Sequence, residues 1–443
     1  MVIGDFSGRS RLDACPGALQ VHAAADGGLA RIRVPGGRLT ASQLRGLADA
    51  AAVHGTGVIE LTSRANVQVR GLGEGDGFAA RMAEAGLLPS STHERIRNVL
   101  ASPLTGCDAE GILDVGPLVS ELDRRLCARP GLAGLPGRFL FALDDGRGDV
   151  AWLGPDAGML PTGPEEAALV LAGADSGLRV PVTSAVTALL AAAEAFLAEL
   201  AARGVHAWRI GELPGGAEPV AARVRATLET GGAGPVRLRP PAERVRTPPP
   251  AVAGGPVGAV RQPGGRVALG VAVPLGRLTP AQAELLAGLA SADGVRLTPW
   301  RGVVLPGLAR VDLPRAVARL TEAGLVTDPD SPWIGVTACT GRPGCAKSLA
   351  DVQADAARAT VPAGDGAAGT PGTVAPRAAD RPRTGTLPVH WAGCDRRCGR
   401  PRGRVADVVA TGDGYRVNLN GRSLNCTDIE ETTAAVTAAR GGS

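Results

Sequence analysis

The chain has 443 residues, enough for about three compact domains with buried cores of their own. A formal net charge of +4 and an aromatic content of 2% exclude the strongly basic, base-stacking surface typical of nucleic-acid-binding proteins. The longest apolar run, 185–200, is interrupted by Glu194 and Glu199, so it predicts an alanine-rich soluble helix rather than a membrane span. The N-terminus has no apolar core typical of a secretory signal. We therefore expect a cytoplasmic protein without nucleic-acid or membrane partners.

An internal duplication is the first feature met along the chain. Residues 38–72 resemble residues 277–308. Each copy opens with a Thr-x-x-Gln capping box and continues with apolar residues at helical spacing. Two short alternating strands and a second helix follow, so each copy predicts a helix, hairpin, helix unit. One such unit is too small to bury both faces of its sheet, and we expect the two copies to pack together.

The duplication continues into the segments that follow each unit. Residues 99–107 align without gaps on residues 337–345, which places Cys107 opposite Cys345 and Ala101 opposite Cys339. Residues 231–265 are rich in proline and glycine, including the run at 248–250, and they predict a linker between the two halves. A second low-complexity stretch, 361–386, predicts a surface excursion.

Eight cysteines in a long chain without a signal peptide indicate metal or redox use. Four of them form two pairs, Cys339 and Cys345 spaced C-x5-C, then Cys394 and Cys398 spaced C-x3-C. Such a set can hold a tetrahedral zinc ion or a [4Fe–4S] cluster. The first spacing is wider than the roughly two to four residues typical of zinc sites, so it favours iron–sulfur. Zinc and unligated thiols stay open, and we interpret Cys107 as the remnant of a ligand.

These features resemble the nitrite/sulfite reductase superfamily: the run LTSRANVQVRGL (61–72), the cysteine pairs and the duplication. Within it, the segments ASPLTGCDAEGILDVGPL, FALDDGRGDVAWLG and TACTGRPGCAKSLADVQADA are most similar to the precorrin-3B synthases of aerobic cobalamin biosynthesis. The resemblance implies an α+β fold of two pseudo-symmetric halves, each with a small ferredoxin-like half-domain and a larger mixed-sheet domain. The expected domains are half-domain 1 (12–90), a tetrapyrrole-binding domain without cluster (91–230), the linker (231–265), half-domain 2 (266–330) and the [4Fe–4S] domain (331–443).

The same resemblance implies the site residues. The four paired cysteines would bind the [4Fe–4S] cluster, and a tetrapyrrole-sized pocket would lie between the halves. The resemblance implies catalytic cations that neutralise a bound anion, at Arg64, Arg97 and Arg138. At a further position where the reductases carry a cation, this chain has Leu140. The candidate substrate-binding residues come from the repeated turns and motifs, and they include the only lysine of the chain: Arg64, Asn66, Arg97, Asn98, Arg301 and Lys347.

The activity implied is the O2-dependent oxidation of precorrin-3A to precorrin-3B, with hydroxylation at C20 and formation of a γ-lactone. Arginine forks bind carboxylates bidentately, which suits this polycarboxylate substrate. The resemblance also implies a mononuclear non-haem iron, for which His390 is the nearest ligand candidate, and electrons from NADH or a reductase. Two alternatives stay open: a siroheme-dependent sulfite or nitrite reductase, which the leucine at position 140 disfavours, and a non-catalytic Fe–S electron carrier.

Overall fold

The computed structural model describes residues 13–73, 75, 77–230, 237–239, 254–361 and 387–441. The expected domain start at residue 12, the proline run at 248–250, most of the linker and nearly all of the low-complexity stretch 361–386 lie outside these residues. The chain forms two compact units that alternate along the sequence. Unit 1 comprises Met1–His22, Ala30–Arg38 and Met82–Pro249, and unit 2 comprises Ala23–Leu29, Leu39–Arg81 and Pro250–Ser443.

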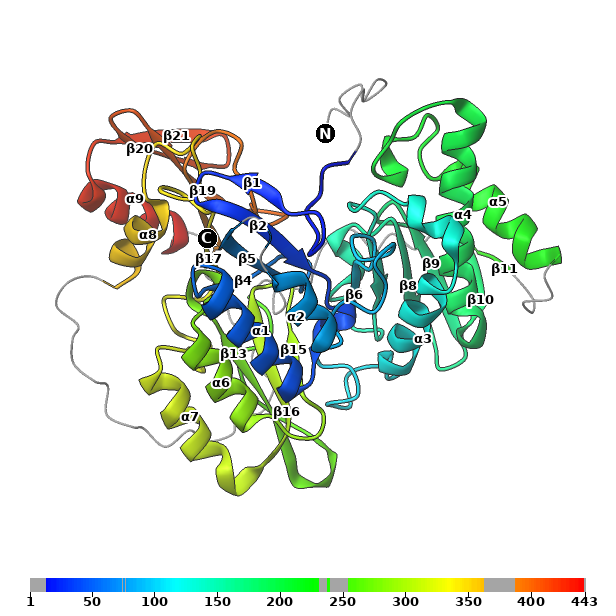
Figure 1. Ribbon diagram of the computed structural model, residues 1–443, viewed down its shortest axis with the longest axis horizontal. Helices are drawn as coiled ribbons and strands as arrows, with labels where there is room; N and C mark the ends of the chain where they lie inside the picture. Colours follow the sequence, from blue (N-terminus) through cyan, green and yellow to red (C-terminus); the bar gives the residue numbers. More distant parts are fainter. Residues whose placement is uncertain are drawn as a thin grey trace. The chain divides into compact units, whose positions relative to one another are not determined.

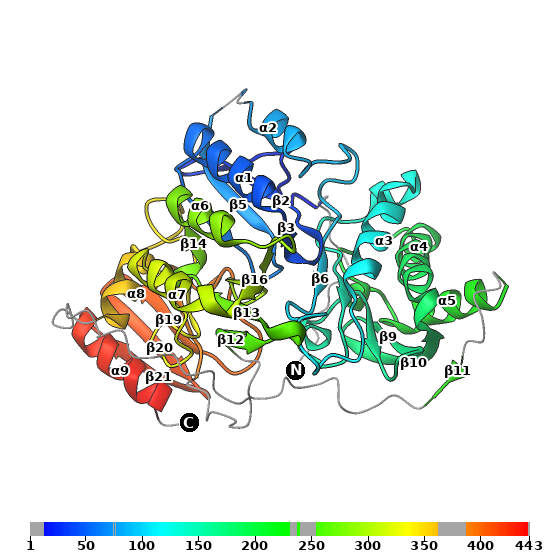
Figure 2. The same cartoon turned by 90° about the horizontal axis from the view of Figure 1, so that it is seen from below.

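The two sequence repeats form two five-stranded sheets with helices against them (Figures 1 and 2). The first repeat supplies β1 (His22–Ala24), β2 (Gly27–Ile32), β4 (Ile59–Leu61), β5 (Val67–Leu72), α1 (Ala41–His54) and α2 (Phe78–Glu84). The second supplies β12 (Gly258–Arg261), β13 (Arg266–Ala272), β15 (Val295–Leu297), β16 (Gly302–Ala309), α6 (Pro280–Leu289) and α7 (Leu313–Glu322). Both predicted capping boxes are present, at Thr40 with Gln43 and at Thr279 with Gln282.

Each repeat completes its sheet with a short strand from the other. The strand orders are β1-β2-β5-β4-β14 and β12-β13-β16-β15-β3, where β14 is Arg277–Leu278 and β3 is Arg38–Leu39. In the first sheet Leu278 pairs with Ile59. Helices α1 and α6 also pack against each other through their buried faces (Figure 2). The expectation that the two copies pack together is therefore confirmed.

Unit 1 contains a six-stranded sheet, ordered β11-β10-β9-β8-β7-β6, with helices packed against it. Its strands are β6 (Val99–Ala101), β7 (Phe141–Leu143), β8 (Ala157–Pro161), β9 (Glu166–Leu171), β10 (Ala174–Pro181) and β11 (Arg237–Leu238). Its helices are α3 (Gly116–Cys127), α4 (Ala185–Arg203) and α5 (Glu218–Thr230). By length and composition α4 could cross a membrane, but most of it is buried, and Leu189, Leu190 and Phe196 lie in the core. The alanine-rich helix predicted for residues 185–200 is therefore present, and it is a helix of the core.

Unit 2 contains a third sheet, ordered β17-β18-β19-β20-β21, with two helices beside it. Its elements are β17 (Val336–Ala338), β18 (Val389–Ala392), β19 (Ala406–Thr411), β20 (Gly414–Leu419), β21 (Arg422–Cys426), α8 (Val352–Thr360) and α9 (Ile429–Gly441). Two parallel pairings are followed by two antiparallel ones, the same succession as from β6 to β10 in unit 1. The larger sheets are therefore duplicated as well, and the predicted α+β class is confirmed.

Candidate metal centre

The two cysteine pairs lie in two loops that leave the same edge of the third sheet. The first loop (339–345) follows β17 and the second (393–398) follows β18. Because these strands are neighbours and run parallel, both loops begin at the carboxyl edge of the sheet. The N–H of Cys339 donates to the carbonyl of Trp391 at 2.9 Å. The pairs, which are 49 residues apart in sequence between Cys345 and Cys394, are thus brought together by strand pairing.

Gly393 joins the two loops. Its N–H donates to Sγ of Cys339 at 3.2 Å, and its carbonyl accepts the N–H of Leu349 at 2.8 Å. A Cβ at this position would lie 1.8 Å from Oγ of Ser348, so only glycine permits the approach. Burial raises the pKa of the Cys339 thiol, and the N–H groups of Gly393 and Gly341 oppose that rise. These N–H groups are the donors that a sulfur ligand with partial negative charge requires.

The spacing of the thiols bears on which metal fits. None of the eight cysteines forms a disulfide. Within the described ranges, no cysteine belongs to a group of three metal-ligating side chains whose atoms lie within 4.8 Å of one another. A tetrahedral zinc ion with Zn–S bonds of about 2.3 Å requires sulfur atoms about 3.8 Å apart. A four-iron cluster holds its thiolates farther apart. The described thiols are therefore not close enough together to surround a single zinc ion as they stand.

In unit 1 the equivalent loops carry oxygen ligands where unit 2 carries thiols. Ser102 directly follows β6 as Cys339 directly follows β17, so the gapless alignment that placed Ala101 opposite Cys339 was wrong by one residue. After β7, Asp145 and Asp149 have the four-residue spacing of Cys394 and Cys398 after β18, but they lie one residue earlier relative to the paired strands. The hydroxyl of Ser102 donates to Asp149 at 2.5 Å and accepts the N–H of Asp145 at 3.0 Å. Side chains of the two corresponding loops are therefore hydrogen-bonded in unit 1.

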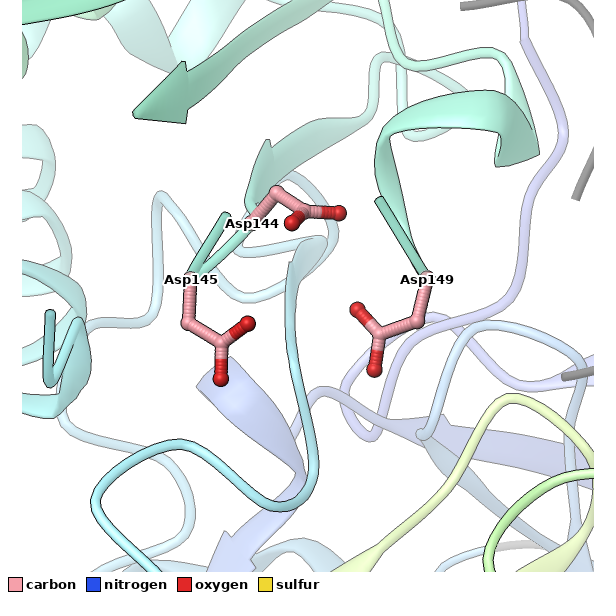
Figure 3. Close-up of side chains that lie close together, drawn as sticks. All are labelled: Asp144, Asp145 and Asp149. Atoms are coloured by element: carbon pink, nitrogen blue, oxygen red, sulfur yellow. The ribbon is translucent and has the colours of Figure 1, made fainter. Parts of the chain in front are cut away.

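Three buried carboxylates lie in this loop of unit 1, with ligand oxygens within 4.8 Å of one another. They are Asp144, Asp145 and Asp149, and Figure 3 shows the last two pointing toward each other across the loop. Asp144 accepts four backbone N–H groups, and Asp145 forms an ion pair with Arg147 at 2.9 Å. Burial raises the pKa of Asp149 well above its usual range, and the negative charge of Asp144 raises it further.

Arg301 and His390, which the sequence suggested for substrate or iron, both lie beside the second cysteine loop. Arg301 is half-buried, and its Nη2 donates to the carbonyl of Gly399 at 2.8 Å. Burial lowers the pKa of Arg301 to about 10. His390 is fully buried in β18, where its Nδ1 lies 3.0 Å from Oγ1 of Thr337. Burial and the nearby arginines lower the pKa of His390 to about 3, so its imidazole is neutral.

Three other predicted residues lie in unit 2. Arg64 and Asn66 occupy the turn between β4 and β5, where Arg64 is half-buried and Asn66 is buried. The N–H groups of both donate to Oγ1 of Thr62, at 3.3 and 3.1 Å, which fixes the turn. Lys347 is exposed two residues after Cys345.

The remaining predicted residues lie in unit 1. The guanidinium of Arg97 is buried and forms two 2.7 Å bonds to Asp123. Asn98 is also buried and donates to the carbonyl of Gly137 at 2.7 Å. Arg138 is half exposed, with its guanidinium carbon 4.5 Å from the ring centroid of Trp208. Arg97 and Asn98 thus stabilise unit 1 internally, whereas Arg138 keeps an accessible charge.

Sequence reasoning did not find the arginine that contacts the first cysteine loop. Arg70 lies at the end of the run 61–72 that carried the family resemblance, and its Nη2 donates to the carbonyl of Gly344 at 2.6 Å. The sequence did contain a signal for this contact: Arg70 stands in a predicted strand of mostly apolar residues. If that strand is buried, the arginine charge requires hydrogen-bonding partners.

Comparison with known proteins shows which family of domains the two repeats resemble. Residues 22–77 and 259–323 match the family model of the nitrite/sulfite reductase ferredoxin-like half domain. The solved structure of the Mycobacterium tuberculosis NirA protein shares the fold, with a TM-score of 0.68 over 92% of this chain and 79% of that chain, at 22% identity. The inferred resemblance is confirmed: both repeats match the nitrite/sulfite reductase ferredoxin-like half domain, and the fold is similar to that of NirA.

Two curated relatives are similar to this chain over most of its length. The chain is 27% identical over 425 residues to a precorrin-3B synthase from Sinorhizobium sp., covering 93% of this chain and 83% of that protein. It is 26% identical over 433 residues to the ferredoxin–nitrite reductase of Synechococcus elongatus, covering 90% of this chain and 79% of that protein. The similarity therefore extends over both duplicated halves and not only over the half domains.

Proposed function

We propose that this chain oxidises precorrin-3A to precorrin-3B with O2, using a [4Fe–4S] cluster held by Cys339, Cys345, Cys394 and Cys398. The observation that supports the activity is the similarity to a precorrin-3B synthase over 93% of the chain. The two cysteine loops at one sheet edge, with the Gly393 N–H directed at Cys339, support the cluster. When bound, the iron would supply the electron and O2 chemistry that side chains lack. We place the activity in the cytoplasm.

The proposed reaction balances with a two-electron donor, either NADH or a partner reductase. One atom of O2 becomes the C20 hydroxyl oxygen of the tetrapyrrole. The other atom leaves as water with two electrons and two protons from the donor. The C20 oxygen and an oxygen of the ring A acetate carboxyl add to the two ends of the double bond between C20 and the adjacent ring carbon, and its π bond breaks. The carboxyl thereby closes the γ-lactone, and the proton it loses becomes the proton of the new C20 hydroxyl.

Within this proposal, the substrate carboxylates bind cationic side chains of the predicted set. Arg64 and Lys347, both in unit 2, are half-buried and exposed, which suits contact with a bound polyanion. Arg138, in unit 1, is likewise accessible. Asn66 fixes the turn that presents Arg64. Arg97 and Asn98 support the binding residues from within unit 1, because their polar groups are directed at Asp123 and at backbone carbonyls.

A second candidate is a siroheme-dependent nitrite or sulfite reductase. The half-domain match and the 26% identity to a ferredoxin–nitrite reductase favour it. Leu140 opposes it, because this side chain is 3% exposed at a position where the resemblance calls for a cation to bind and protonate the anion. We therefore rank tetrapyrrole oxidation first.

The deciding experiment uses protein purified without oxygen. Iron, acid-labile sulfide and haem are measured first, and precorrin-3A is then supplied with O2 and an electron donor. A sulfide-containing, haem-free protein that forms the hydroxylated lactone supports the proposal. A bound siroheme with turnover of sulfite or nitrite, and no product from precorrin-3A, favours the second candidate.

A further inference from the structure

We propose that Arg70 and Arg301, one from each half domain, are positioning residues that hold the two cysteine loops at the separation a cluster needs. The inference rests on the proposed cluster and concerns how unit 2 keeps its ligand loops in place. The two arginines come from strands or turns of the repeated half domains, whereas the loops belong to the third sheet.

Arg70 holds the first loop. Its guanidinium forms a bidentate pair with Asp26, at 2.8 Å for both bonds, and its Nη2 also donates to the carbonyl of Gly344 at 2.6 Å. Gly344 directly precedes Cys345. A Cβ at Gly344 would lie 2.8 Å from Oδ2 of Asp26, so glycine lets the loop approach the ion pair. The Arg70 charge also interacts electrostatically with Cys345.

Arg301 holds the second loop. Its Nη2 donates to the carbonyl of Gly399 at 2.8 Å, and Gly399 directly follows Cys398. Arg301 is the last residue of the turn before β16 and has a positive φ of 59°, an uncommon conformation for a residue with a Cβ. The backbone strain indicates that the turn is held in place by its contacts, of which the bond to Gly399 is one.

A third contact reaches the first loop from the same half domain as Arg301. Arg277 in β14 donates to Oε1 of Gln353, and Nε2 of Gln353 donates to the carbonyl of Cys339 at 3.2 Å. Backbone carbonyls at or next to three of the four cysteines therefore accept hydrogen bonds that originate in the half domains. Arginines donate to the carbonyls of Gly344 and Gly399. Gln353, which Arg277 contacts, donates to the carbonyl of Cys339. Outer partners of metal ligands commonly fix the ligands in this way.

The test compares R70M, R301M and the wild type, all purified without oxygen and loaded to the same iron and sulfide content. Iron release to a chelator is measured by absorbance, together with the cluster reduction potential and the melting temperature of the cluster-free protein. We expect R70M and R301M to release iron about 10- to 100-fold faster than the wild type. Loss of a nearby cation should also make the potential more negative. R301K should restore slow release, because an ammonium can still donate to Gly399.

R45A is the matched control. Arg45 pairs with Glu284 at 2.9 Å between the two half domains but contacts neither cysteine loop, and both side chains are about half exposed. R45A should release iron at the wild-type rate. Wild-type release from R70M and R301M would overturn the inference, as would faster release that only follows a lower melting temperature of the cluster-free variants. A wild type without iron and sulfide would instead contradict the proposed function itself.

Discussion

Ser102 donates a hydrogen bond to Asp149 at 2.5 Å in unit 1, which joins the two loops that correspond to the cysteine loops of unit 2. The duplicated sheets thus place corresponding loops at corresponding edges, although the side chains differ. A serine hydroxyl can donate a hydrogen bond to a carboxylate, whereas thiolates are suitable ligands for a metal. One scaffold therefore carries a hydrogen-bonded network of a serine and carboxylates in unit 1, and in unit 2 the four thiols proposed as cluster ligands.

Replacing Cys394 with serine is expected to remove the cluster and the activity together, because a hydroxyl is a poor ligand for iron–sulfur. Iron and sulfide content and turnover of precorrin-3A measure the two effects. Cys127→Ser, at the end of α3 in unit 1, should leave both unchanged. Full turnover by a cluster-free Cys394→Ser protein would contradict a catalytic role for the cluster.

The Asp149→Asn substitution is expected to stabilise the protein at neutral and alkaline pH. The folded protein holds the Asp149 proton at pH values where the unfolded chain, with a pKa near 3.8, has released it. The free energy of unfolding is therefore greatest below about pH 3.8, falls as the pH rises through the folded-state pKa, and stays low above it. An amide carries no charge, so this loss should disappear.

Thermal unfolding from pH 4 to pH 8 checks this expectation. The melting temperature of the Asp149→Asn variant should exceed the wild-type value at pH 8, and the difference should narrow toward pH 4. Asp413→Asn, in an exposed turn after β19, serves as the control and should show no such trend. A variant less stable than the wild type at every pH would show that the carboxylate is required as an anion.

Replacing Arg97 with alanine is expected to destabilise unit 1 by about 1.5–3 kcal/mol, the range for hydrogen bonds to charged groups. The Arg97 side chain is 6% exposed, and the substitution would leave Asp123 without its partner. Chemical denaturation measures the change. Arg138→Ala should change stability far less, because the Arg138 side chain is 50% exposed. Equal stability of the two variants would argue against the internal role of Arg97.

Replacing Arg64 with alanine is expected to weaken tetrapyrrole binding by about 1.5–3 kcal/mol, since one charged hydrogen bond to a carboxylate is lost. Titration with precorrin-3A under argon, followed by absorbance, gives the dissociation constant without turnover. Arg45→Ala removes an arginine from the same half domain and should bind with wild-type affinity. Unchanged affinity of Arg64→Ala would place Arg64 outside the binding site.

The sequence by itself determined the local and repeated features. Three features could be read from the order of residues alone: the capping boxes at Thr40 and Thr279, the duplication, and the paired spacing of the cysteines. The structure contains both capping boxes and both repeats. Residues 185–200 were likewise predicted as an alanine-rich helix from their composition, and α4 covers them. Such features can be recognised without knowledge of the fold, because helix ends and periodic apolar faces depend on residues only a few positions apart.

Only the tertiary structure decided which distant groups meet. A one-residue difference in loop length placed Ser102, and not Ala101, opposite Cys339, and alignment without strand ends did not show it. Arg70 and Gly344 are 274 residues apart, yet they are hydrogen-bonded because separate strands bring them together. Arg97 carried the same motif signal as Arg64, but Asp123 on α3 occupies its guanidinium. A charged side chain takes whichever partner the fold provides, and the sequence does not specify that partner.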